Sequence, residues 1–173
     1  MTMASTFDVD KPWKTDLAQR ASQRREAVAK EIEAAVKKAP SFEDSLRLAA
    51  ELMKKRFARF TAVTIYVADG EDLAVFASLE RPAGPDRIGS GTGPLAEAAQ
   101  GNVPVVIGNL HSSAPWTGIG LTTGSAMVAP VRTEAGLWAI VEIWSDFRDA
   151  FSPHDARVLA RIAMALARKT PAA

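Results

Sequence analysis

The sequence predicts one α+β domain, with helices at both ends of the chain and paired strands between them. From Leu137 to Trp144 aliphatic residues alternate with a set that mixes aromatic and polar character, as in a strand, and Ser152-Pro153-His154-Asp155 then signals a capped helix. A second strand-like run, from Thr61 to Val67, leads into a tight Asp69-Gly70 turn that is typical of a β-hairpin. Helical periodicity dominates the chain before these strands. Helices at both ends with paired strands between them favour the α+β class.

Composition limits the function classes open to this chain. Of its 173 residues, 47% are hydrophobic and 24% are charged, which is typical of a globular protein. The net charge of +1 predicts neither nucleic-acid nor membrane binding. The absence of Cys excludes disulfides, thiolate metal sites and thioether-linked cofactors. Neither a basic leader nor an apolar run of about 18 residues is present, which favours a cytoplasmic location.

The first part of the chain predicts a flexible tail over residues 1–15 and a long amphipathic helix over 16–40. Good helix formers dominate this helix, and apolar residues recur on one of its faces. Acidic residues interrupt its basic residues, so we interpret them as a solvated face and not as a nucleic-acid surface. Pro40 ends the helix, and Ser41 with Asp44 forms a capping-box-like start for a second helix.

The remaining elements of the expected domain, residues 41–168, alternate between strands and short helices. In chain order they are strands at Thr61 to Val67 and Leu73 to Ser78, a helix at Pro94 to Gln100, strands at Val103 to Ile107, Ser125 to Val131 and Leu137 to Trp144, and a helix at Pro153 to Ala167. Gly and Pro predict a loop from Glu80 to Pro94, and a second polar loop runs from Asn109 to Gly124. Residues 169–173 are expected to form a C-terminal tail.

This order of elements resembles the GAF domain, a small-ligand sensing and dimerisation fold of signalling proteins. The segments that carry the resemblance are Ile88-Gly89-Ser90-Gly91-Thr92-Gly93, Pro94 to Gln100, Val103 to Leu110, Ser125 to Val131, and Ile140 to Ser145 before Phe151-Ser152-Pro153-His154-Asp155. The resemblance implies an α/β/α sandwich with a central antiparallel sheet of five to six strands. The N- and C-terminal helices would cover one face, and a short helix with loops would cover a pocket on the other.

The activities of GAF subfamilies transfer only where the residues match. Free methionine sulfoxide reductases use cysteines and an acidic residue near the end of the last strand, whereas this chain has no Cys and has Trp144 at that place. Bilin-binding members attach their chromophore through Cys, so no covalent chromophore is expected. His111 stands in a loop where certain gas-sensing relatives ligate haem, but we interpret it as an exposed loop residue. The sequence therefore predicts a chain that is not an enzyme and leaves its cofactor unknown.

Strand alternation selects the residues expected on the pocket face. On the last strand, Leu137, Ala139, Val141 and Ile143 suit burial under the helices, whereas Trp138, Ile140, Glu142 and Trp144 suit the pocket. The residues expected to join them from neighbouring strands are Thr64, Tyr66, Phe76 and Met127. Aromatic walls with a few polar groups are typical of small-molecule sites, although buried aromatic residues also serve ordinary packing.

Two polar features are candidates for specific recognition. Glu142 lies in an apolar strand, so it either meets a cation or ligand donor or is exposed or ion-paired. The backbone N–H groups near Leu95 and Ala96, at the start of the short helix, favour a small anion, although water also caps such ends. This helix start resembles the one that nitrate-sensing GAF members use beside an aromatic wall. In this chain Trp116 or Phe76 would supply that wall.

Three function hypotheses follow. The first is a non-catalytic, cytoplasmic sensor that binds a small molecule or a small anion and signals through a homodimer of its terminal helices or through a separate partner protein. The second is a dimerisation or interaction module whose pocket is filled by its own side chains. The third, an enzyme related to the free methionine sulfoxide reductases, is disfavoured by the absence of Cys.

Overall fold

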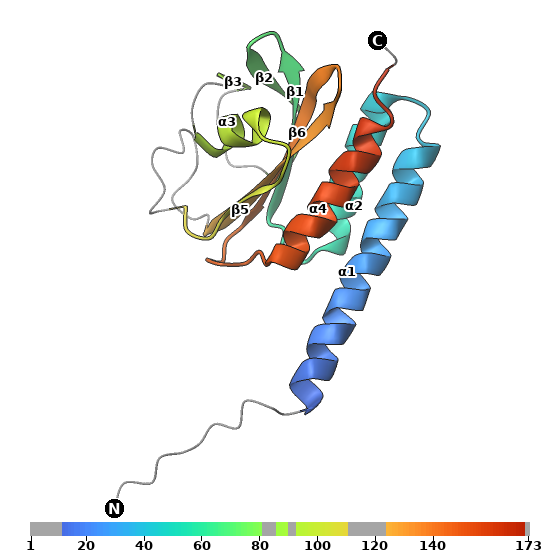
Figure 1. Ribbon diagram of the computed structural model, residues 1–173, viewed down its shortest axis with the longest axis vertical. Helices are drawn as coiled ribbons and strands as arrows, with labels where there is room; N and C mark the ends of the chain where they lie inside the picture. The colour runs from blue at the N-terminus through green and yellow to red at the C-terminus, as the bar shows by residue number, and fades with distance from the viewer. Residues whose placement is uncertain (1–11, 81–85, 90–92, 111–123, 172–173) are drawn as a thin grey trace, which may run out of the picture.

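The computed structural model describes residues 12–80, 86–89, 93–110 and 124–171, and these contain four helices and six strands (Figure 1). The helices are α1 (Pro12–Lys38), α2 (Phe42–Arg56), α3 (Gly93–Gln100) and α4 (Pro153–Ala167). The strands are β1 (Ala62–Asp69), β2 (Asp72–Leu79), β3 (Arg87–Gly89), β4 (Val105–Ile107), β5 (Ser125–Thr133) and β6 (Gly136–Ser145). The short strand β3 lies where a loop was predicted, and α1 begins at Pro12 instead of Asp16.

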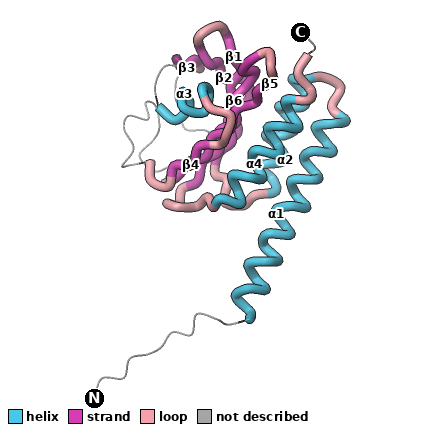
Figure 2. The backbone as a smooth tube through the Cα atoms, in the orientation of Figure 1, coloured by secondary structure: helices cyan, strands magenta, loops and turns pink. Residues whose placement is uncertain are grey.

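The six strands form one antiparallel sheet in the order β3-β2-β1-β6-β5-β4. Strands β1 and β6 lie at its centre, paired from Ala62 opposite Trp144 to Val67 opposite Ala139. Figure 2 shows α1, α2 and α4 on one side of the sheet and α3 on the other. This arrangement confirms the predicted α+β sandwich.

The larger hydrophobic core lies between the sheet and the layer formed by α1, α2 and α4. Its sheet residues are Val63, Ile65, Met127, Ala129, Val131, Ala139, Val141 and Ile143. The helices supply large side chains that are at most 1% exposed, namely Ile32, Leu46, Met53, Leu159, Ile162 and Leu166. Full burial of one such side chain stabilises the fold by about 1.5–3 kcal/mol. This core therefore dominates the stability of the domain.

Asp155 joins separate parts of the helix layer. Its backbone N–H donates to Ser152 Oγ, and its carboxylate accepts from the Ser152 backbone N–H at 2.8 Å, which completes a capping box at the start of α4. The same buried carboxylate pairs with Arg25 of α1 at 3.0 Å and with Arg59, after α2, at 3.4 Å. These ion pairs hold α1 and the α2–β1 connection against α4.

The first turns of α1 extend beyond the rest of the domain (Figure 1). No residue from 15 to 24 is buried, and the side chain of Leu17 is 57% exposed. Buried residues of α1 begin at Ala29, where the helix lies against α2 and α4. Neither α1 nor any other helix in the described ranges is long and apolar enough to cross a membrane.

Candidate functional site

Three polar side chains lie buried at the centre of the sheet, on the face opposite α1, α2 and α4. They are Thr64 and Tyr66 of β1 and Glu142 of β6, and each is at most 1% exposed. Thr64 pairs directly opposite Glu142, and Tyr66 follows two residues later on the same face. The phenol of Tyr66 donates a hydrogen bond to Glu142 Oε2 at 2.8 Å. We refer to these three residues as the polar cluster.

The polar cluster has an energetic cost that packing does not explain. Burial of a carboxylate costs several kcal/mol unless partners compensate it, and Tyr66 supplies one such partner to Glu142. Within the described part of the chain, Thr64 Oγ1 has no hydrogen-bond partner. A buried hydroxyl left without a partner costs about 1–3 kcal/mol. Groups of this kind in a native structure call for an explanation, and ligand binding is one.

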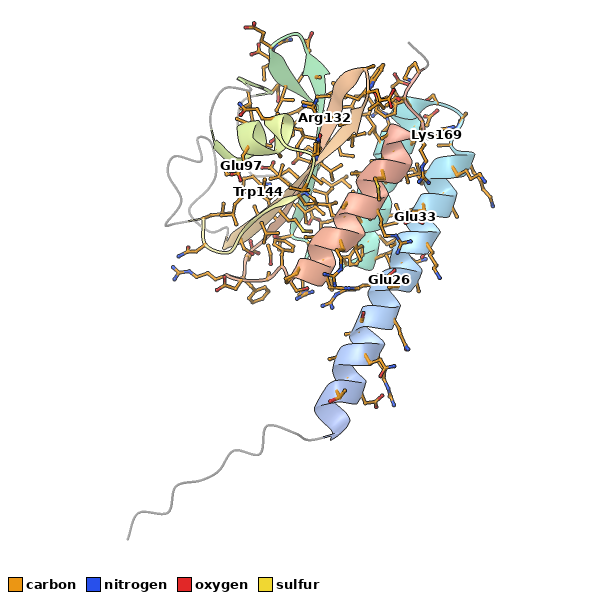
Figure 3. All side chains as sticks on the ribbon, in the orientation of Figure 1. Glu26, Glu33, Glu97, Arg132, Trp144 and Lys169 are labelled. Carbon is orange, nitrogen blue, oxygen red and sulfur yellow. The ribbon has the colours of Figure 1, made fainter. Side chains whose placement is uncertain are left out.

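Apolar residues surround the polar cluster and form a second hydrophobic core beneath α3. The sheet supplies Leu73, Ile107, Ala126, Val128 and Ile140, while α3 and the chain after β4 supply Leu95, Ala98, Ala99 and Leu110. The guanidinium of Arg132 donates to the carbonyl of Ala99 in the last turn of α3 (Figure 3). A cation at this position is favourable, because the C-terminal end of a helix carries partial negative charge. The contact helps to fix α3 over the sheet.

Three of the predicted site residues lie on the same face of β1 and β6. Tyr66 and Glu142 are in contact, and Trp144 lies two residues after Glu142, opposite Ala126 of β5. The Trp144 side chain is 2% exposed. The structure therefore rules out the alternative in which Glu142 is exposed to solvent.

The residues expected from α3 and from the loops are placed only in part. Leu95 and Ala96 are buried, and Leu95 belongs to the apolar wall of the second core. Trp116 and His111 lie outside the residues that the structure describes. No group of three His, Asp, Glu or Cys side chains in the described ranges is placed to hold a metal ion.

Met127 does not lie on the pocket face, which corrects its predicted place in the site. It pairs opposite Ile143, and both side chains belong to the helix-side core. The cause is a β-bulge in β6: Arg132 pairs with Leu137 and Val131 with Ala139, so Trp138 is an extra residue. One extra residue moves the following side chains to opposite faces relative to the partner strand.

The same bulge reverses the predicted faces of Leu137 and Trp138. Leu137 packs with the core under α3, whereas Trp138 packs against the helix-side core. The Trp138 ring meets Phe42 edge-on, with ring centroids 6.0 Å apart, and its Nε1–H donates to Thr133 Oγ1 at 3.0 Å. Trp138 is therefore a packing residue of the helix layer.

Phe76 also lies on the helix side, contrary to the prediction. Tyr66 pairs with Val75 and Ile65 with Ala77, so Phe76 is the extra residue of a bulge in β2. Its ring packs against the helix-side core, and the Arg47 guanidinium of α2 lies 4.7 Å above the ring centroid. Val75, which pairs with Tyr66, packs against the core beneath α3 instead.

Several solved structures share this fold. Free methionine-R-sulfoxide reductase from Neisseria meningitidis, in complex with its substrate, aligns with a TM-score of 0.79 at 19% identity over 97% of this chain and 95% of that chain. A putative GAF sensor protein from Burkholderia vietnamiensis aligns with a TM-score of 0.78 at 19% identity over 86% and 94%. The type II free methionine-R-sulfoxide reductase from Thermoplasma acidophilum has a TM-score of 0.68 at 24% identity over 73% and 90%. At these identities the likeness shows the fold alone.

The prediction that this chain is not an enzyme is contradicted, because enzymes share its fold. Structures with the same fold include free methionine-R-sulfoxide reductases, which are enzymes, beside GAF sensors. One fold commonly hosts several functions, so membership in it does not exclude catalysis. The absence of Cys removes only chemistry that would use a thiol of this chain.

No curated protein matches this sequence. The sequence profile of the GAF domain matches residues 39–168, from the end of α1 to the residue after α4. That range contains the whole sheet, the polar cluster and α3. The match confirms the resemblance seen in the motifs, and the chain belongs to the GAF domain family.

Proposed function

We propose that this GAF domain binds a small organic molecule with an ammonium or amide group on the sheet face beneath α3. The polar cluster carries the proposal: a buried carboxylate held by Tyr66 lies beside Thr64, whose hydroxyl has no partner among the described residues. A ligand group beside Thr64 would supply the missing hydrogen bond. A positive charge near Glu142 would offset the cost of burying its carboxylate.

The surrounding wall defines the rest of the ligand. Leu73, Leu95, Val128 and Ile140 offer apolar surface suited to a short hydrocarbon chain. Glu142 on the same face disfavours a small anion, because like charges repel most strongly where water is scarce. The charge of the cluster therefore supports a small organic metabolite over nitrate.

Amino acids are the first ligand class to examine. Two of the structures that share this fold are reductases of free methionine-R-sulfoxide, and that molecule is an amino acid with an ammonium group and a flexible side chain. An ammonium group of this kind would complement Glu142, and the side chain would meet the apolar wall. This relation supports the ligand class and leaves the reaction, if there is one, to experiment.

Isothermal titration of the purified chain with methionine, methionine sulfoxide, butylamine and nitrate tests the proposal. We expect heat from the ammonium compounds and none from nitrate. Glu142→Gln keeps the shape of the side chain and removes its charge, so it should weaken ammonium binding about tenfold to a hundredfold. The matched control is Glu97→Gln, on the exposed surface of α3, which should leave the affinity unchanged (Figure 3).

Equal affinity of Glu142→Gln and the parent chain for every ligand would contradict this function. Heat from nitrate alone would contradict it as well, since it would show that an anion occupies the site. After titration with methionine sulfoxide, samples incubated with a dithiol and analysed for methionine would show whether binding leads to reduction.

A further inference from the structure

A groove runs between α1 and α4, in the helix layer, which lies across the sheet from α3 (Figure 2). Its volume is about 770 Å³, a size typical of ligand and peptide sites. Residues of both helices and of the segment after α4 line it, among them Lys30, Ala34, Lys37, Met164, Arg168 and Lys169. We refer to this feature as the α1–α4 groove.

The two helices run in parallel, so their C-terminal ends meet at one end of the α1–α4 groove. Successive contacts show the direction: Ser22 Oγ lies 3.4 Å from His154 Nε2, Glu33 pairs with Arg161 at 2.7 Å, and Lys169 Nζ donates to the Ala39 carbonyl at 2.7 Å. Figure 3 shows Glu26, Glu33 and Lys169 in this order along the interface. These contacts hold the backbones of α1 and α4 in place relative to each other along the groove.

The charge in the groove is strongly positive. Within the described residues, Lys30, Lys37, Arg168 and Lys169 form no ion pair. The carboxylate of Glu33, the acidic residue in the lining, is already paired with Arg161. Four cations thus line one groove without carboxylate partners in the described part of the chain.

Helix dipoles account for only part of this charge. Cations near the last turn of a helix are stabilised by its partial negative charge, and Lys37, Arg168 and Lys169 occupy such positions. Each helix end carries about half a negative charge, so two ends offset about one cation. Lys30 lies two turns before the end of α1 and takes no part in this effect. A net positive charge remains for a partner.

The floor of the groove is apolar. Met164 of α4 is 53% exposed, and the small side chains of Ala34 and Ala165 flank it. Lys30, Ala34 and Lys37 recur at helical spacing on α1, and Arg161, Ala165 and Arg168 recur in the same way on α4. Each triplet spans about 10 Å, or two helical turns. Small residues between cations allow a third helix to approach closely.

We propose that the α1–α4 groove docks an acidic amphipathic helix of a partner protein. Its apolar side chains would cover Met164, Ala34 and Ala165, and its carboxylates would pair with Lys30, Lys37, Arg168 and Lys169. A second copy of this chain would bring an equally basic groove against this one, so charge opposes self-association through it. The surface differs from the polar cluster, so this proposal is independent of the ligand site.

The probe is a fluorescein-labelled peptide of about 16 residues, a length near the limit for an isolated helix, with Leu at helical spacing and Glu at flanking positions. Fluorescence anisotropy should report saturable binding to the full chain that weakens as salt rises from about 50 to about 300 mM. The double variant Lys37→Glu/Arg168→Glu should bind about tenfold more weakly. The matched control, Lys55→Glu, reverses an exposed lysine in the last turn of α2 and should change affinity less than about twofold.

Circular dichroism must show that the double variant keeps its helices. Where it does not, Lys30→Glu, away from the helix end, replaces it, with an expected loss of about threefold. Replacement of Leu by Ser in the peptide should also weaken binding about tenfold, because the apolar floor then loses its partner.

Three outcomes would overturn the proposal. The first is equal peptide affinity of the parent chain and the charge-reversed variant. The second is equal binding of the Ser peptide or of an oligonucleotide of similar charge, which would identify a general polyanion surface. The third is self-association, in sedimentation velocity, that the charge reversal abolishes, which would identify a second copy as the occupant.

Discussion

The two faces of the central sheet are filled in different ways. The face towards α1, α2 and α4 presents apolar side chains to apolar helix residues. The face beneath α3 is also largely apolar, but it places Thr64, Tyr66 and Glu142 in its centre. Hydrophobic burial explains most of the first face. It does not explain the second, where polar groups are retained at an energetic cost, as is expected of a functional site.

The largest expected difference between the two faces is in the loss of stability when an isoleucine of β6 on each face is truncated to alanine. Ile143 faces the helix layer and Ile140 faces α3, and both are fully buried. Ile143→Ala should lower the free energy of unfolding by about 4 kcal/mol, and Ile140→Ala by about 2–3 kcal/mol, because the smaller core around Ile140 loses fewer contacts. Urea unfolding, analysed at a common m-value, measures both. Equal losses would mean that the two faces are packed alike.

A smaller effect of opposite sign is expected at Thr64. Thr64→Val removes a buried hydroxyl that lacks a hydrogen-bond partner among the described residues, so the free energy of unfolding should rise by about 1 kcal/mol. The same substitution should weaken ligand binding, which is the usual trade-off at a functional site. Urea unfolding and titration on the same samples measure the two effects.

Thr61→Val is the matched control for this substitution. Thr61 precedes β1, and its hydroxyl donates to the Trp144 carbonyl at 3.1 Å, so its loss should lower the free energy of unfolding by about 1 kcal/mol. If Thr64→Val destabilised the domain as much as Thr61→Val does, the Thr64 hydroxyl would have a partner in the folded chain. The polar cluster would then be a structural network.

Local sequence patterns predicted the elements of this fold other than β3, and the helix starts at Ser41 and Ser152. They also placed Tyr66 and Glu142 on the face opposite the helices, because alternation is unbroken in β1 and in β6 after Ala139. The errors lie at or beyond bulges. An extra residue in a strand has no clear signal in the sequence, yet it reverses the faces of the residues on one side of it relative to those on the other.

Long-range pairing was a second limit to prediction. The contact between Tyr66 and Glu142 depends on β1 lying beside β6, and the residues of neither strand specify that neighbour. The α1–α4 groove has the same origin. The basic residues of α1 were interpreted as a solvated face, and only the parallel packing of α4 adds Arg168 and Lys169 to them.

The smallest expected effect on stability tests whether Trp138 lies on the helix-side face, where the bulge in β6 places it. Trp138→Phe keeps the edge-on contact with Phe42 and removes the hydrogen bond to Thr133, so it should cost about 0.5–1 kcal/mol of unfolding free energy. Thr133→Val removes the other partner, and the double variant should lose less than the sum of the two single losses. Ligand affinity should not change. A change in ligand affinity with no loss of stability would mean that Trp138 lies on the pocket face. Met127 would then lie on that face too, because the same bulge sets the faces of both residues.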